Sequence, residues 1–135
     1  MTLKDPAKDK IIQKIRSRLS QEKNIVFAYV HGSFLGENGF NDIDIAVFLD
    51  PKTAAPNPVD LGIALSLKLE KSLNVPVDVK ILNSAPLSFR YHATKGKLIL
   101  DCDDVVREDF LCRTWSDYFD FKPVAKIYLR EATGA

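Results

Sequence analysis

Two aspartates interrupt an otherwise apolar segment of this sequence. Asp42 and Asp44 open the stretch "DIDIAVFL", which first alternates polar and apolar residues and then becomes wholly apolar. In a strand, residues two positions apart point to the same face, so both carboxylates would share one site while Ile43 and Ile45 point away from it. Carboxylates held this close repel each other, and a hard divalent cation would relieve that repulsion.

A third aspartate lies in a second apolar segment. Asp78 stands between Val77 and Val79 in "VPVDVKIL", where the flanking pattern favours burial. Aspartates on neighbouring strands could bind one or two Mg²⁺ ions, because this ion prefers carboxylate oxygens together with water and substrate phosphate. The competing interpretation is that Asp42 and Asp44 are solubilising charges on an edge strand.

A glycine-containing turn just before the first pair favours the chemical interpretation. Gly32 lets the backbone approach a ligand closely, and Ser33 adds a hydroxyl at the predicted start of a short helical turn. Backbone N–H groups at such a start attract phosphate. We therefore expect neighbouring phosphate and metal sites, and we interpret His31, which precedes the turn, as a strand-end residue and not as a base.

Size and composition limit the classes of protein to consider. The chain has 135 residues, 46% of them hydrophobic and 27% charged, with a net charge of +1. We predict one domain over residues 1–135 and no strong binding of nucleic acid. The N-terminal residues are too polar for a secretion signal, and no apolar run approaches the roughly 20 residues that span a bilayer, so a cytoplasmic protein without membrane association is expected. Cys102 and Cys112 are interpreted as reduced and structural, without a zinc site.

The order of predicted elements indicates an α/β or α+β fold. The predicted fold consists of a mixed sheet of about four strands with flanking helices and a long C-terminal helix. Helices are predicted at 5–22, from Asn57-Pro58 through a stripe of leucines to about 73, at 84–92 and at 103–130, and strands at 24–31, 42–49, 75–82 and 96–100. The helix after Asn57 would serve as a crossover between two strands. Pro123 is expected to end or kink the last helix near Phe121.

Charged and aromatic residues near the C-terminus have simpler interpretations. Asp101, Asp103 and Asp104 are interpreted as a charged helix start and not as a second metal site. The aromatic residues from Phe110 to Phe121, Trp115 among them, are expected to lie mostly in the core, with a smaller share in a partner interface.

Taken together, Gly32-Ser33, Asp42-Ile43-Asp44 and Asp78 resemble the minimal nucleotidyltransferases of the DNA polymerase β-like superfamily. The segment from "GKLIL" to "YFDFKP" looks like the C-terminal half of the MntA antitoxins, which are paired with HEPN toxins of the HepT type. The resemblance covers most of the chain from about residue 25 and implies a polymerase β-like fold. One departure is the spacer "FLGENGFN" between Ser33 and Asp42, which has eight residues and no arginine, whereas about ten are typical.

The resemblance implies a reaction and roles for these residues. AMP would pass from ATP to a hydroxyl, in this case a tyrosine of a partner HEPN toxin, which is thereby neutralised. Asp42 and Asp44 would hold two Mg²⁺ ions, and Asp78 would complete the ion on the acceptor side and help to remove the hydroxyl proton. Gly32 and Ser33 would bind the nucleotide phosphates.

Two other functions agree with the same residues. One is a non-catalytic antitoxin of this fold that neutralises its partner by binding alone, for which the short spacer without arginine is the argument. The other is an enzyme that nucleotidylates a small molecule such as an aminoglycoside. Either a homo-oligomer or a hetero-oligomer is compatible with the sequence.

Overall fold

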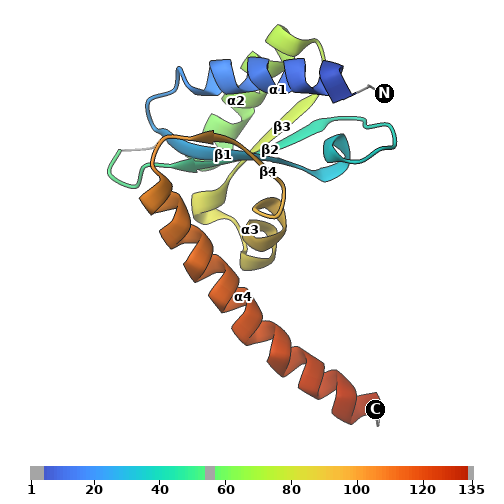
Figure 1. Cartoon of the computed structure of the whole chain (residues 1–135). Coiled ribbons are helices and arrows are strands. Elements are labelled where there is room, and N and C mark those ends of the chain that lie inside the picture. The colour runs from blue at the N-terminus through green and yellow to red at the C-terminus, as the bar shows by residue number, and fades with distance from the viewer. Residues whose placement is uncertain (1–4, 54–56, 134–135) are drawn as a thin grey trace.

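A four-stranded sheet separates two pairs of helices (Figure 1). The computed structural model describes residues 5–53 and 57–133, with side chains for residues 6–53 and 57–120. Its elements in chain order are α1 (Asp5–Leu19), β1 (Ile25–His31), the 3-10 turn η1 (Gly32–Leu35), β2 (Ile43–Leu49), α2 (Pro58–Leu73), β3 (Val77–Ile81), the 3-10 turn η2 (Leu82–Ser84), α3 (Leu87–Ala93), β4 (Lys97–Asp101) and α4 (Asp104–Thr133).

The sheet has the strand order β3-β2-β1-β4 and is mixed, as predicted. β1 runs antiparallel to both β2 and β4, whereas β2 and β3 are parallel. A parallel pair needs a crossover, and α2 provides it. Asn57 caps this helix, because its Oδ1 accepts a hydrogen bond of 2.9 Å from the N–H of Val59, and Pro58 occupies the first turn.

One face of the sheet packs against α1 and α2 through aliphatic side chains. Ile45 and Val47 of β2 are completely buried on this side. Opposite them lie Ile15 of α1 and the leucines of α2, of which Leu65 and Leu69 are buried. The predicted leucine stripe therefore faces the main core, and it holds the crossover helix against the sheet.

The opposite face carries a smaller, aromatic core beneath α3 and α4. The rings of Phe27 and Phe48 stack with their centroids 4.9 Å apart, and Phe110 of α4 covers both of them. Farther along, α3 and α4 are joined by Tyr91 and Tyr118, whose ring centroids are 3.7 Å apart. The expected core role of the aromatic segment is thus confirmed for Phe110, whereas Phe119 is 46% exposed.

The outer edge of β3 is covered by side chains of α2. Ser66 Oγ accepts a hydrogen bond of 2.8 Å from the N–H of Val79, and Glu70 Oε1 accepts one of 3.0 Å from the N–H of Val77. Gly62 allows this approach, because a Cβ there would lie 2.7 Å from the carbonyl oxygen of Val79. Edge N–H groups that are satisfied in this way do not pair with another strand.

Two predicted helix ends differ from the structure. α1 ends at Leu19, and the chain continues to Glu22 in turns, in which the N–H groups of Gln21 and Glu22 donate to carbonyls three residues earlier. Pro123 does not end the last helix, since α4 continues through it to Thr133 and extends away from the sheet (Figure 1), whereas a kink near Phe121 stays a prediction. A proline removes one backbone hydrogen bond, and helical bonding on both sides of that position maintains the helix. None of the helices in the described ranges is both long and apolar enough to span a membrane.

Candidate functional site

Three side chains form a row across the strands β1, β2 and β3. His31, the last residue of β1, pairs with Asp44, and Asp44 pairs with Asp78 of β3. Directly paired residues project from the same face of a sheet, so the row lies on the side that α3 and α4 partly cover. Asp42 immediately precedes β2 and is half-buried. The structure therefore brings the predicted carboxylates together from neighbouring strands.

Asp44 and Asp78, together with Asp42 just before β2, repel one another, and we call the row of His31, Asp44 and Asp78 the carboxylate row. The pKa of Asp44 is raised above its ordinary value of 3.8, first by burial and then by the negative charges of Asp42 and Asp78. Lys80 opposes this shift, and its Nζ lies 3.6 Å from Oδ2 of Asp78. The repulsion that the sequence predicts is thus present, with one lysine as partial compensation. Lys80 was not singled out from the sequence, although its position two residues after Asp78 places it on the same face of β3.

The carboxylates alone do not form a closed metal cage. In the described ranges, no group of three or more His, Cys, Asp or Glu side chains is arranged to hold a metal ion. Mg²⁺ in phosphoryl-transfer sites usually keeps several waters and takes one or two carboxylates plus substrate phosphate oxygens. Asp42, Asp44 and Asp78 supply oxygen donors of the type that this ion prefers, so the donor set fits a cation that binds together with a nucleotide.

The turn η1 packs directly against Asp44. Gly32 has a φ of +79°, in the left-handed region that favours glycine, and a Cβ at this position would collide with Oδ2 of Asp44. Ser33 follows it in the turn and is exposed. The predicted short helical turn is therefore confirmed, and it lies beside the carboxylates. That its N–H groups bind phosphate stays a prediction.

Lys8 of α1, which is far from this turn in the sequence, holds the turn in place through hydrogen bonds and ring contacts. Its Nζ donates hydrogen bonds of 2.7 Å to the carbonyl oxygen of Phe34 and 2.8 Å to that of Gly36. It also lies over the rings of Phe34 and Phe40, at 5.3 and 5.7 Å from their centroids. Both phenylalanines are buried and pack edge to face, so the short spacer is anchored near both of its ends. Sequence reasoning missed Lys8, because nothing in a helical lysine indicates a partner 26 residues away.

The sequence matches a protein-family model over the part of the chain that contains these features. The model is described as Polymerase beta, Nucleotidyltransferase, and it matches residues 13–105. This range includes η1, all three aspartates and all four strands. The chain belongs to this family.

Solved structures show the same fold over nearly the whole nucleotidyltransferase chain. A chain in a crystal structure of the toxin–antitoxin MntA–HepT is 21% identical, with a TM-score of 0.68 and coverage of 93% of this chain and 98% of that one. A second, in a structure of a tri-AMPylated Shewanella oneidensis HEPN toxin in complex with MNT antitoxin, is 20% identical, with a TM-score of 0.65 and coverage of 90% and 98%.

A third chain comes from a crystal structure of the toxin–antitoxin with AMP-PNP. It is 23% identical, with a TM-score of 0.67 and coverage of 92% of this chain and 97% of that one. A comparison with curated protein sequences gives no match. At these identities the likeness establishes the fold, and it confirms the predicted polymerase β-like sheet with flanking helices and a long C-terminal helix.

His31 occupies the end of the carboxylate row in this nucleotidyltransferase. Its ring is half-buried and meets the ring of Phe89 edge-on, with centroids 5.4 Å apart. Burial lowers the pKa of His31, and the negative charge of Asp78 opposes that effect. The prediction that His31 ends a strand is confirmed, and its burial favours the neutral ring.

The two cysteines and the start of α4 lie outside the site. Cys102 and Cys112 are free thiols, as predicted, but both are exposed, so the interpretation of them as structural is wrong. Cys102 follows β4 directly and Cys112 faces solvent on α4, where a thiol fills no part of the core. Asp103 caps α4, because its Oδ1 accepts hydrogen bonds from the N–H groups of Val105 and Val106, which confirms the predicted helix start.

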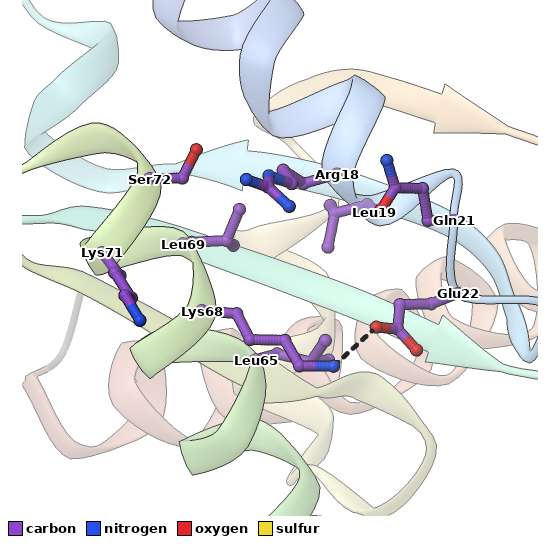
Figure 2. Close-up of a pocket in the computed structure, with 9 residues that line it drawn as sticks. All are labelled: Arg18, Leu19, Gln21, Glu22, Leu65, Lys68, Leu69, Lys71 and Ser72. Carbon is purple, nitrogen blue, oxygen red and sulfur yellow. Dashed lines mark hydrogen bonds and ion pairs between the residues drawn. The ribbon is translucent and has the colours of Figure 1, made fainter.

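A cavity of about 520 Å³ opens between α1 and α2, on the other face of the sheet. Its lining includes the buried side chains of Leu19, Leu65 and Leu69. Figure 2 shows these leucines and the ion pair between Lys68 and Glu22, whose charged atoms lie 3.2 Å apart. None of the residues that line it belongs to the carboxylate row. This cavity therefore does not coincide with the candidate site, which is distinguished by its charged side chains.

Proposed function

We propose that the chain is a Mg²⁺-dependent nucleotidyltransferase that transfers AMP from ATP to a tyrosine hydroxyl of a HEPN-type toxin and so acts as an antitoxin. The observation that carries the proposal is the pairing of Asp44 with Asp78 beside the turn that begins at Gly32. Two relatives of the same fold support it, one from a complex with a tri-AMPylated HEPN toxin and one with AMP-PNP.

Each predicted site residue has a role in this proposal. Asp42 and Asp44 would hold Mg²⁺ together with the triphosphate, and Asp78 would complete the ion on the acceptor side. Gly32 and Ser33 would present backbone N–H groups and a hydroxyl to the phosphates. When bound, the ions would neutralise charge that develops on the attacking and leaving oxygens.

The reaction requires little further acid-base chemistry from the protein. The acceptor oxygen attacks the α-phosphorus of ATP, and the bond from that phosphorus to the oxygen bridging the α- and β-phosphates breaks. Pyrophosphate leaves in line with the attack. The hydroxyl proton passes to a carboxylate oxygen of Asp78, which faces the acceptor, and then to solvent. The protein residues thus position the two oxygens and accept one proton.

The test is to incubate the protein with Mg²⁺, ATP and the HEPN-type partner and to measure the intact mass of the partner. We expect AMP adducts with the wild type and none with Asp42→Asn combined with Asp44→Asn. Asp117→Asn, which removes an exposed carboxylate on α4, is the matched control and should retain full activity. Adducts that form equally with the double variant would refute the proposal.

A second function is supported by the spacer before Asp42, which has eight residues and lacks arginine. A spacer of this kind agrees with a protein of this fold that neutralises a toxin by covering its surface. In that case, alanine at Asp42, Asp44 and Asp78 should leave both partner binding and neutralisation unchanged, and neutralisation should not need ATP.

A further inference from the structure

A small cavity lies at the outer edge of β3, directly beyond the carboxylate row. Its volume is about 270 Å³, and Asp78 and Lys80 line it together with Val59 and Ile63 of α2 and Pro86 before α3. Asp78 therefore belongs both to the row and to this cavity. The cavity is formed entirely by residues in the described ranges, and the proposed catalytic roles use none of its other walls.

The strand order gives the site a direction. The turn with Gly32 follows β1, Asp44 lies on β2, Asp78 lies on β3, and β3 is the edge strand. A nucleotide whose phosphates contact the turn would occupy the β1 side of the carboxylates. The acceptor must then reach the phosphorus from the opposite side, because attack and departure are in line. That opposite side is the β3 edge, where the cavity opens.

The size and the walls of the cavity select the kind of acceptor. Pockets for drug-sized ligands measure roughly 300–1,000 Å³, so 270 Å³ suits one side chain better than a nucleoside triphosphate. Val59, Ile63 and Pro86 give it apolar walls. Lys80 and Asp78 form an ion pair of 3.6 Å, so the polar part of the cavity wall carries one positive and one negative charge. Apolar walls and a balanced polar part suit a neutral phenol better than a polycationic aminoglycoside.

The apolar walls are unusually open to solvent for their residue types. Val59 is 68% exposed and Ile63 is 54% exposed, one helical turn apart on α2. Leu67 continues the same stripe at 60% exposed, but it does not line the cavity. Large apolar side chains beside a half-buried carboxylate gain favourable burial when an aromatic ring covers them.

We infer that this cavity binds the acceptor tyrosine, with its ring between Val59, Ile63 and Pro86 and its hydroxyl toward Asp78. This inference rests on the proposed function. Val59 and Ile63 are then specificity-determining residues that touch the acceptor and not the nucleotide. Their loss raises the KM for the protein acceptor and leaves kcat and nucleotide binding nearly unchanged.

The experiment compares the double variant Val59→Ser with Ile63→Ser against Leu67→Ser, which removes a similarly exposed side chain from the same stripe outside the cavity. The acceptor is the HEPN-type partner, and the readouts are steady-state AMP transfer and the Kd of the complex by calorimetry. We expect the double variant to raise both KM and Kd about tenfold and Leu67→Ser to change neither. AMP-PNP should bind all three proteins equally.

Two results would overturn the inference: a double variant with wild-type KM and Kd, or a Leu67→Ser variant that weakens binding as much. Failure of the proposed function gives a different result, namely a wild type that forms no AMP adduct. The Kd comparison between the cavity variant and Leu67→Ser then still decides whether the partner contacts this cavity. Weaker AMP-PNP binding by the double variant would also contradict the inference, because it would place the nucleotide at the β3 edge.

Discussion

The two faces of the sheet are covered in different ways. On one face, α1 and α2 bury a continuous set of aliphatic side chains along the strands. On the other, α3 and α4 cover an aromatic cluster around Phe27 and Phe48 and leave the end of the sheet with His31, Asp44 and Asp78 only half-buried. The same strands thus contribute a closed core on one side and an open polar row on the other.

This difference locates the site and explains the unusual sequence of β2. Asp44 and Ile45 are adjacent in the chain. The carboxylate of Asp44 is only half-buried and has a raised pKa, whereas the side chain of Ile45 is completely buried in the main core. Strand alternation allows a charged group to lie one residue from the main core without disturbing it. Substitutions at these two positions should therefore separate activity from stability.

The largest effect is expected at Asp44. Asp44→Asn keeps the shape of the side chain but removes a charge that would hold Mg²⁺ and the triphosphate. AMP transfer should fall about 1,000-fold, which corresponds to about 4 kcal/mol in the activation free energy. The free energy of unfolding without metal should not decrease, because Asp42 and Asp78 repel the charge that is removed. Intact-mass assays and urea unfolding measure the two quantities, and a large loss of stability would contradict the separation of the faces.

The neighbouring position should behave in the opposite way. Ile45→Ala opens a cavity under α1 and α2, and the free energy of unfolding should fall by roughly 3 kcal/mol. The folded fraction should retain AMP transfer close to the wild-type rate per molecule. Chemical denaturation with a parallel activity assay tests this, and a variant that is stable but inactive would show that the two faces are coupled.

The sequence predicted most of the elements of both faces, because those elements depend on local patterns. The leucine stripe of α2, the start of that helix at Asn57-Pro58 and the alternation around Asp44 are all short-range signals, and each is confirmed. The parallel pairing of β2 with β3 followed from the length and helical pattern of the connection between them. These features place Asp44 and Asp78 on neighbouring strands, whereas the direct pairing of the two residues is seen only in the structure.

Long-range contacts could not be predicted in this way. The position of β4 beside β1 and the hydrogen bonds from Lys8 to the turn depend on how distant segments pack. Lys80 was missed because a lysine on an edge strand is ordinarily a solvated charge. The roles of the three aspartates, Gly32 and Ser33, the single domain and the cytoplasmic location stay predictions until they are measured.

A smaller effect is expected at the turn that joins β1 to the open end of the sheet. Gly32→Ala places a Cβ against Oδ2 of Asp44 at a φ of +79°, so it should lower the free energy of unfolding by about 1–3 kcal/mol and reduce AMP transfer as well. Gly36→Ala is the matched control, since its Cβ would meet only the carbonyl oxygen of Ser33 at 3.4 Å and its φ is −79°. Thermal unfolding should show a loss of stability for Gly32→Ala and none for Gly36→Ala. Equal losses of stability in the two variants would show that an added side chain is not tolerated at either position of the loop.

The smallest effect should appear on the aromatic face at high pH. Tyr29 is buried there, and burial raises its pKa above the ordinary value of 10.0, although the nearby Arg107 guanidinium opposes the shift. A tyrosine with a raised pKa stabilises the folded state below its unfolded pKa, and this contribution is lost as pH rises through its folded pKa. Wild-type stability should therefore fall more steeply above pH 10.0 than that of Tyr29→Phe. Urea unfolding just below and well above this pH measures the difference, and identical slopes would mean that Tyr29 ionises as easily in the folded protein as in the unfolded chain.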